Sequence, residues 1–164
     1  MGFNFGGINH LALVCHDMDV TTKFYTEVLG MKLTKTLNLP NDMGKHFFFD
    51  TGGGDAIAFF WFPNGPEKVN EDELKKITTT PGTMNHVAID VSPDDIDRYR
   101  ELLIEKGVEV TEIINHDDSS TGMSPDINET TFVRSLYFKD PDGIQLEFAA
   151  WTRPLTEADV QYPE

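Results

Sequence analysis

The segments INHLALVC (residues 8–15) and MNHVAIDV (residues 84–91) open two similar halves of the chain. Each contains an Asn-His pair followed by apolar and β-branched residues, a pattern typical of a β-strand. A stretch with apolar residues at helical spacing follows each segment and ends at a glycine, Gly30 in the first half and Gly107 in the second. The spacing between the two histidines matches the spacing between the two glycines to within one residue. Self-similarity in register over this length indicates an internal repeat.

Three more strands are predicted after each helix. In the first half the runs are MKLTKTLNL, GKHFFFDT and DAIAFFWF, with a hairpin turn at Gly52 to Gly54. In the second half the runs are VEVTEIIN, FVRSLYF and GIQLEFAAW, with a turn at Asp140 to Gly143 before the last. These patterns predict an α+β fold of two tandem βαβββ modules that form a cupped mixed sheet. The predicted boundaries are residues 1–62 and 83–151 for the modules, 63–82 for a linker and 152–164 for a C-terminal tail.

Local signals mark the helix starts and the long loops. Asp17 is the predicted N-cap of the first helix, and Ser92 is that of the second, with Pro93 at its first position. The linker is predicted to contain a short helix at residues 71–77. The loop at residues 116–131 has no pattern of its own, and its length is typical of a lid, a binding segment or a disordered region.

The chain of 164 residues is acidic, with 28 acidic against 13 basic side chains and a formal net charge of −15. This charge repels phosphate backbones and anionic membrane surfaces, so neither nucleic acid nor a membrane is a predicted partner. No run approaches the roughly 18 apolar residues of a membrane span. The single cysteine, Cys15, cannot form an intramolecular disulfide, which favours a reducing compartment and a cytoplasmic protein.

Three polar residues fall on strand faces that the helices do not use. Side chains alternate along a strand, so His86 and Glu147 each point away from the apolar side chains of their own strands. His10 occupies the position of His86 in the first half. A single buried histidine is more often a hydrogen-bonded core residue than a ligand, and a buried glutamate can pair with a base. Two repeat-related histidines and one carboxylate, however, can offset the cost of their burial by sharing a cation. We therefore predict that the cupped sheet closes around a divalent metal held by His10, His86 and Glu147.

The repeat also tests for a fourth ligand. When the halves are aligned, Ala58 falls at the position of Glu147, and alanine cannot coordinate a metal. Asn9 and Asn85 precede the histidines and are predicted to point to the opposite face, so they are not counted as ligands. Three ligands leave positions open for water, substrate or oxygen. A face of two histidines and one carboxylate is diagnostic of Fe(II) oxygen chemistry, although Mn(II), Zn(II) or Ni(II) can accept the same donors.

Four motifs together span the chain from about Ile8 to Trp151. They are Asn9-His10, Phe24-Tyr25-x-x-Val28-Leu29-Gly30-Met31, Asn85-His86-Val87-Ala88 and Asp140-Pro141-Asp142-Gly143-x-x-x-Glu147. With these motifs the chain resembles the vicinal oxygen chelate superfamily, which includes glyoxalase I, extradiol dioxygenases, fosfomycin-resistance proteins and bleomycin-resistance proteins. The motifs are specific for the fold and the metal site and much less specific for the reaction.

The resemblance implies that His10, His86 and Glu147 are the metal ligands. Glyoxalase-like isomerases use a fourth ligand where this chain has Ala58, and sequestering proteins of the bleomycin-resistance type usually lack the ligands. Extradiol dioxygenases keep a tyrosine ten positions before the glutamate, the place of Tyr137, although an aromatic residue there can also serve packing. The leading expectation is an Fe(II) dioxygenase that cleaves a catechol-like or vicinal-oxygen aromatic substrate. The alternatives are a three-ligand Mn(II) thiol transferase or lyase of the fosfomycin-resistance type, a glyoxalase-like isomerase, and a protein that sequesters a small molecule.

The remaining predictions concern the base, the pocket and the assembly. His46 and His116 are candidate bases because histidine titrates near neutrality, and His116 either closes over the site or is simply exposed. Tyr137 is expected to donate a hydrogen bond to a chelating oxygen. Arg134, if it reaches the pocket, would indicate a carboxylate on the substrate. A homodimer is expected by analogy, with the metal site inside one chain or shared between two. The predicted pocket walls, some of which can instead be ordinary core, are Ala58, Phe48, Phe60 and Phe62.

Overall fold

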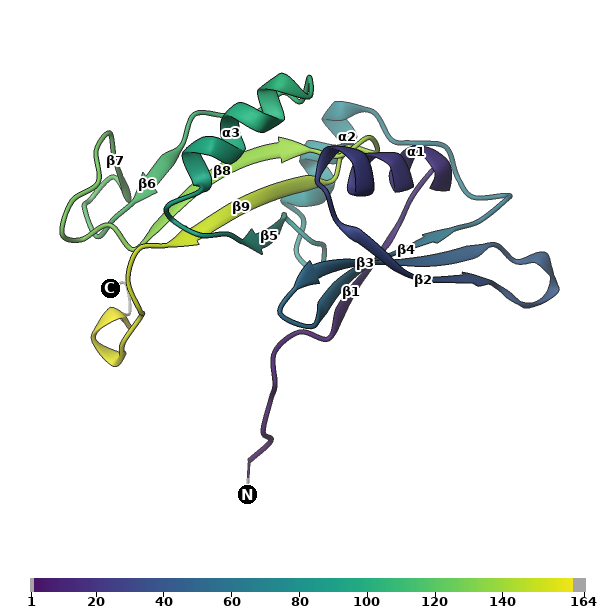
Figure 1. The fold of residues 1–164 in the computed structure, drawn as a ribbon, viewed down its shortest axis with the longest axis horizontal. Helices are drawn as coiled ribbons and strands as arrows, with labels where there is room; N and C mark the ends of the chain where they lie inside the picture. Colours follow the sequence, from purple (N-terminus) through teal and green to yellow (C-terminus); the bar gives the residue numbers. More distant parts are fainter. Residues whose placement is uncertain (1, 161–164) are drawn as a thin grey trace. The chain divides into compact units, whose positions relative to one another are not determined.

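The structure is a computed structural model that describes residues 2–160. It forms two compact units: unit 1 is the chain up to Thr80 together with Asp140–Gly143, and unit 2 is Pro81–Lys139 together with the chain from Ile144 onward. Each unit has one sheet with a helix packed on one of its faces (Figure 1). The predicted α+β class is confirmed. Over the described residues, no helix is long and apolar enough to cross a membrane.

Unit 1 is built on a mixed sheet in the order β1-β4-β3-β2. Its strands are β1 His10–Val14, β2 Lys32–Asn38, β3 Lys45–Gly52 and β4 Asp55–Trp61, with a short 3-10 turn at Pro40–Asp42 between β2 and β3. β1 runs parallel to β4, and the other neighbouring strands are antiparallel. A parallel pair requires a crossover connection, which the first helix provides.

The crossover helix α1, Met18–Lys23, continues as a π-helical turn over Phe24–Val28. The predicted N-cap is confirmed, because the Asp17 carboxylate accepts hydrogen bonds from the backbone N–H groups of Asp19 and Val20. These bonds satisfy donors that the first helical turn leaves without intrahelical partners. The helix start is therefore encoded by its own local sequence.

Tyr25 fixes the helical segment on the sheet. Its fully buried ring lies against Phe49 and Phe59, with ring centroids 5.4 and 4.9 Å apart. Its hydroxyl donates a hydrogen bond to Asp140 (3.3 Å), and burial together with this carboxylate raises the pKa of Tyr25 far above its ordinary value. The helix thus occupies the sheet face that carries Phe49 and Phe59, and the opposite face carries His10.

The turn Asp140–Gly143 belongs to unit 1, although the strands on either side of it belong to unit 2. The backbone N–H of His16 donates to the Asp142 carboxylate (3.0 Å). Lys68 pairs with the same carboxylate at 3.6 Å and also donates to the carbonyl of the turn's proline. The predicted linker helix follows as α2, Glu71–Thr78. Unit 1 therefore holds this turn by a backbone donor at His16 and a side-chain donor at Lys68.

Unit 2 is built on a sheet in the order β5-β9-β8-β6-β7. Its strands are β5 Val87–Asp90, β6 Ile114–His116, β7 Met123–Ser124, β8 Val133–Lys139 and β9 Gln145–Trp151. β5 runs parallel to β9, and the other neighbouring strands are antiparallel. The strand predicted over residues 108–115 is shorter than expected, because Val110 makes only an isolated bridge to Phe138 before β6 begins.

Helix α3, Ile96–Glu105, lies along one face of β8 and β9 (Figure 1). Ile96 and Leu103 are buried, and the Tyr99 ring meets Phe148 edge-on with centroids 5.9 Å apart. The apolar side chains of β9 therefore face this helix. The side chains that alternate with them lie on the other face of the sheet.

The start of α3 differs from the prediction. Ser92 does not cap the helix; its hydroxyl accepts a hydrogen bond from the backbone N–H of Asp94 (3.3 Å) within a turn. The helix begins at Ile96, and Asp95 occupies the cap position without a capping hydrogen bond from its side chain, which accepts from Arg98 instead. Pro93 therefore lies in the turn before the helix. Serine favours both arrangements, so the sequence pattern did not separate them.

The loop after β6 is held together by Asp117, which is 6% exposed. Its carboxylate accepts hydrogen bonds from the backbone N–H of Ser119 (3.1 Å), from the Ser119 hydroxyl, and from the Asn128 side-chain amide (2.9 Å). These bonds lower the pKa of Asp117 to about 2. The long segment that has no sequence pattern of its own is thus held by hydrogen bonds between Asp117 near its start and Asn128 near its end.

The C-terminal tail packs through Arg153. Its guanidinium pairs with Asp159 at 2.6 Å and with Asp118 at 3.4 Å. Asp159 ends a short 3-10 turn, Glu157–Asp159. The last part of the predicted tail, residues 161–164, lies outside the described residues.

Gly44, in the turn between β2 and β3, has little room for a side chain. Its φ is +145°, and a β-carbon there would overlap the backbone carbonyl of Trp61. Gly54 also has a positive φ, +94°, but nothing lies within 4 Å of its β-carbon position. We expect Gly54→Ala to lower the free energy of unfolding by about 1–2 kcal/mol, and Gly44→Ala to lower it by about 1–3 kcal/mol more. Urea denaturation measures both, and equal losses would contradict the steric overlap.

Candidate metal centre

A contact between His86 and Glu147 forms the centre of the site in unit 2. His86 directly precedes β5, and Glu147 lies in β9 between its ladder partners Ala88 and Tyr137. The His86 Nε2 lies 2.8 Å from the Glu147 Oε2, and Glu147 is 6% exposed. Ladder partners share a sheet face, so these groups lie on the face opposite α3, as the alternation of the strands predicts.

Tyr137 lies beside this pair. Its ring meets the His86 ring edge-on, with centroids 5.8 Å apart. Burial raises the pKa of Tyr137, and the neighbouring Glu147 carboxylate raises it further. The phenol therefore stays protonated at neutral pH and is able to donate a hydrogen bond.

In unit 1, His10 begins β1 and is the first member of a line of ring contacts, here called the aromatic row. The centroid of His10 lies 5.5 Å from that of Phe48, which lies 4.4 Å from that of His46. His46 stacks on Phe60 at 3.6 Å, and Phe60 lies parallel to Phe62 at 5.9 Å. Phe48 and Phe60 are half-buried and Phe62 is exposed. The structure thus brings three of the predicted pocket residues together on the sheet face of His10.

Two other predicted residues of this face, His46 and Ala58, are buried. His46 is 7% exposed, its Nδ1 lies 3.1 Å from the Phe59 carbonyl oxygen, and one face of its ring is covered by Phe60. This arrangement favours packing over the predicted role as a base, because a base must reach the proton that it removes. Ala58 is fully buried opposite Phe48 in the ladder.

The structure places His116 at the end of β6 rather than in the loop. It pairs with Val133 of β8, four residues before Tyr137. At roughly 3.3 Å per residue, this separation is on the order of 13 Å along the strand. His116 is therefore outside hydrogen-bond reach of the His86–Glu147 pair, and the structure does not support its predicted role as a base there.

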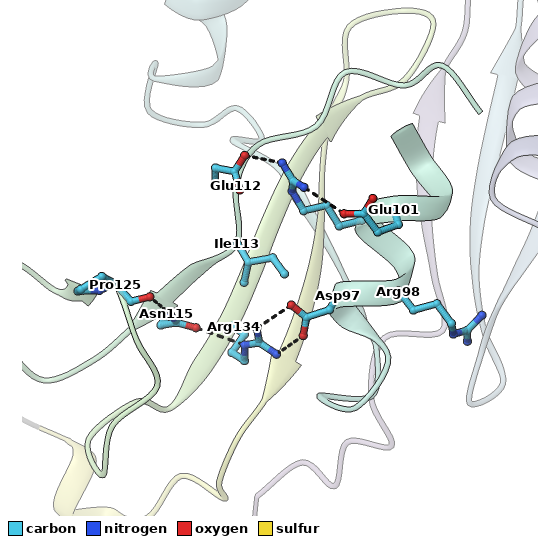
Figure 2. A pocket seen from close by; sticks show the side chains of 9 residues that line it. Asp97, Arg98, Glu101, Glu112, Ile113, Asn115, Pro125 and Arg134 are labelled. Carbon is cyan, nitrogen blue, oxygen red and sulfur yellow. Dashed lines mark hydrogen bonds and ion pairs between the residues drawn. The ribbon is translucent and has the colours of Figure 1, made fainter. Parts of the chain in front are cut away.

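Arg134 lies on the opposite face of the sheet in unit 2. Its guanidinium donates to both oxygens of the Asp97 carboxylate in α3, at 2.9 and 3.2 Å, and to the Asn115 side chain at 3.2 Å (Figure 2). This pairing lowers the pKa of Asp97. Arg134 thus connects helix and sheet, and it does not join His86 and Glu147 as a pocket residue.

A groove of about 400 Å³ lies beside Arg134. Most of its charged side chains are paired with one another, since Arg100 contacts Glu101 and Glu112 while Arg134 contacts Asp97 (Figure 2). Arg98 pairs with Asp95 instead. Charge is thus balanced within the groove, and it contains no histidine. The lining residues are Asp97, Arg98, Arg100, Glu101, Glu112, Ile113, Asn115, Pro125 and Arg134.

The donors that face each other in unit 2 suit a cation. An imidazole nitrogen and a carboxylate oxygen are ligands of Fe(II), Mn(II), Zn(II) and Ni(II) alike. Over residues 2–160, no group of three or more His, Cys, Asp or Glu side chains lies close enough to hold a metal. Within unit 2, the structure brings together two of the three predicted ligands, His86 and Glu147.

Asn9 and Asn85 contact the histidines, contrary to the sequence-based expectation. The Asn9 Oδ1 lies 2.8 Å from the His10 Nδ1, and the Asn85 Oδ1 lies 2.7 Å from the His86 Nδ1. Both asparagines precede the regular strands, so strict alternation of side chains does not apply to them. The sequence feature that could have indicated these contacts is the repetition of the whole Asn-His pair in both halves.

Residues 7–148 match the family model described as Glyoxalase/Bleomycin resistance protein/Dioxygenase superfamily. The uncharacterized protein YwkD of Bacillus subtilis (strain 168) is 26% identical over 140 residues, which cover 85% of this chain and 93% of YwkD. Metallothiol transferase FosB of Shouchella clausii (strain KSM-K16) is 24% identical over 86% of this chain and 77% of its own length. MhqE of Bacillus subtilis (strain 168), named as a candidate ring-cleaving dioxygenase, is 27% identical over 65% of this chain, which is 33% of MhqE.

Solved structures share the fold. The glyoxylase/bleomycin resistance protein/dioxygenase domain from Frankia sp. EAN1pec has a TM-score of 0.67 and 24% identity, covering 93% of this chain and 96% of that domain. The fosfomycin resistance protein FosX from Listeria monocytogenes has a TM-score of 0.58 and 23% identity, covering 91% and 94%. At these identities the likeness establishes the architecture alone.

The geometry assigns Arg134 to stability rather than to the metal site. Its side chain is 12% exposed and carries hydrogen bonds to a carboxylate, so we expect Arg134→Met to lower the free energy of unfolding by about 1.5–3 kcal/mol. Arg98→Met is the control, because that side chain is 60% exposed and a change within about 0.5 kcal/mol is expected. Chemical denaturation measures both variants. Reduced metal affinity in Arg134→Met at unchanged stability would instead place Arg134 in the site.

Proposed function

Because this chain belongs to the Glyoxalase/Bleomycin resistance protein/Dioxygenase superfamily, we propose that it is a metal-dependent enzyme whose cation is held by His10, His86 and Glu147. The observation that carries the proposal is the 2.8 Å contact between the His86 Nε2 and the buried Glu147 carboxylate. A protonated Nε2 would donate a hydrogen bond to the carboxylate at this distance. Without that proton, the same two atoms could bind one divalent metal at adjacent coordination positions.

The repeat supports His10 as the third ligand. It is the counterpart of His86, and each of these histidines has an asparagine oxygen at its Nδ1. His10 would join the other two donors within one chain or, in a homodimer, from a second copy. Ala58, the counterpart of Glu147, offers no donor, so a three-ligand site leaves coordination positions for a substrate.

A bound divalent cation would supply a Lewis acid that lowers the pKa of a coordinated hydroxyl. The protonated phenol of Tyr137 would donate a hydrogen bond to a substrate oxygen beside Glu147. The aromatic row would hold a planar ring on the His10 face by stacking and edge-on contacts and would exclude water from it. In this proposal the residues bind and orient the substrate, and the chain contributes no nucleophile.

The preferred substrate is an aromatic compound with two adjacent oxygen atoms, and the preferred reaction is cleavage of its ring by dioxygen with Fe(II). The half-buried rings of Phe48 and Phe60 support an aromatic ligand. The pairing of Arg134 with Asp97 leaves that cation unavailable to an anionic substrate group. The similarity to MhqE supports the same reaction class. Both atoms of dioxygen would enter the ring-opened product, so no external reductant is needed.

A second candidate is an Mn(II)-dependent thiol transfer of the FosB kind. The matched region is 77% of the FosB of Shouchella clausii but only 33% of MhqE. FosX also shares the architecture. The same donor set serves both reactions, because Mn(II) and Fe(II) accept the same ligands.

Glu147→Gln tests the metal proposal, since the amide keeps the shape of the side chain and removes its charge. We expect the affinity for Mn(II), measured by calorimetric titration, to fall by more than about 100-fold, beyond the usual effect of losing an outer-shell partner. Glu112→Gln is the matched control, because that side chain is 87% exposed and lies in the groove beside α3. Unchanged affinity in Glu147→Gln would contradict the proposed ligand set.

Oxygen consumption separates the two candidate reactions. Chain loaded anaerobically with Fe(II) is expected to take up oxygen with members of a catechol panel and to form a yellow product. Consumption of a thiol with fosfomycin by Mn(II)-loaded chain, without oxygen uptake, would decide for the FosB kind of reaction.

We expect Tyr137→Phe to lower kcat by about 10- to 1,000-fold, a range around the usual contribution of a positioned proton donor.

A further inference from the structure

We propose that Asn9 and Asn85 are positioning residues that fix the tautomer of the two metal-binding histidines, so that each ring presents an unprotonated Nε2 to the cation. The inference rests on the proposed metal site and extends it to two residues outside the ligand set. It is carried by one contact that occurs twice. The side-chain oxygen of each asparagine lies at the Nδ1 of the next residue, at 2.8 Å for His10 and 2.7 Å for His86.

The chemistry of the two groups gives this contact a direction. A neutral imidazole carries one N–H, which sits on either nitrogen. An amide oxygen only accepts hydrogen bonds, so an Oδ1 at this distance from Nδ1 selects the form with its proton on Nδ1. The lone pair is then on Nε2, where a metal binds. Free histidine in water prefers the tautomer protonated on Nε2, so the contact with asparagine changes which ring nitrogen carries the proton.

Both asparagines reach this position by the same local route. Each precedes the histidine at the start of an edge strand, β1 in unit 1 and β5 in unit 2. Each edge strand runs parallel to the strand that carries Ala58 or its counterpart Glu147. Two units that differ in most other side chains have kept the same pair of contacts. This repetition separates the arrangement from an accidental contact between neighbours.

At His86 the asparagine has a further effect, because the ring has an acceptor on each side. The Glu147 Oε2 lies 2.8 Å from Nε2, and the Asn85 Oδ1 lies 2.7 Å from Nδ1. Without Asn85, the single ring proton would go to Nε2, where it would bind Glu147 and occupy the place of the cation. When a cation takes the place of that proton, the Asn85 oxygen would accept a hydrogen bond from the proton that remains on Nδ1 and so keep the Nε2 lone pair directed at the metal. The imidazole and the carboxylate would then both be available to one metal.

Nitrogen-15 NMR of the imidazole rings in the full metal-free chain, at a pH where histidine is neutral, reads the tautomer of His10 directly. The wild-type ring is expected in the form protonated on Nδ1. Asn9→Leu removes the acceptor and should shift the ring toward the form protonated on Nε2, whereas Asn9→Asp keeps an acceptor and should retain the wild-type form. Asn38→Leu, on β2 at the other edge of the same sheet, controls for the added apolar surface.

Titration with Mn(II) measures how the two asparagines affect the affinity for the metal. Asn9→Leu and Asn85→Leu should each weaken binding by about 10- to 100-fold, the usual effect of losing an outer-shell partner. The corresponding Asp variants should bind at least as tightly as the wild type. A purely structural role would not give this rescue together with the change of tautomer.

Two outcomes would overturn the inference: a wild-type His10 protonated on Nε2, or Leu variants that keep both the wild-type tautomer and the wild-type affinity. Either outcome leaves the proposed metal site standing. A wild-type chain that fails to bind Mn(II), Fe(II) or Zn(II) overturns the proposed function instead. The NMR measurement needs no metal and still decides whether the asparagine orients the histidine.

Discussion

The free-energy cost of burying a carboxylate governs the candidate site. Glu147 is 6% exposed in a chain of net charge −15, so its ionised form needs hydrogen-bond donors or a positive charge beside it. Its partner is the His86 Nε2 at 2.8 Å. An imidazole balances the charge only while it is protonated, whereas a divalent cation balances it and also accepts the imidazole lone pair. A fold that keeps these two groups on one face therefore suits the cation that we propose.

The sheet of unit 2 enforces that placement. Glu147 is paired in the ladder with Ala88 on one side and Tyr137 on the other, and the alternating side chains of β9 pack toward α3. A slip of β9 by one residue would turn the carboxylate toward the helix and apolar side chains toward the site, so burial strongly specifies the register. The chain enters β9 directly from the Asp140–Gly143 turn. That turn is held in unit 1 by Tyr25 and by the donors of its first half.

The sequence predicted the features that are local or repeated. The period of the strands places Glu147 on the face away from the helix, and the duplication identifies both histidines without any knowledge of tertiary contacts. The prediction from sequence was wrong where one pattern is compatible with two local structures. At Ser92 the hydroxyl accepts a hydrogen bond within a turn before α3 and does not cap the helix. The prediction also failed for partners distant along the chain. The pairing of Arg134 with Asp97 depends on how α3 lies on the sheet, and the stacking of His46 depends on the register of β3 against β4, which no periodicity encodes.

The two candidate reactions use the same ligands, so the surroundings of the ligands decide between them. The face of His10 carries phenylalanine and histidine rings, and Arg134 and Arg100 of unit 2 are neutralised by carboxylates. A substrate with a phosphonate or carboxylate group would have little besides the metal to balance its charge, and it would approach against the field of a chain with net charge −15. In the proposed function a catechol would arrive uncharged, would gain ring contacts, and would acquire negative charge only where the metal compensates it. Under the proposed function, electrostatics and aromatic contact therefore favour ring cleavage, because the metal would balance the charge of a deprotonated catechol as it would balance that of Glu147.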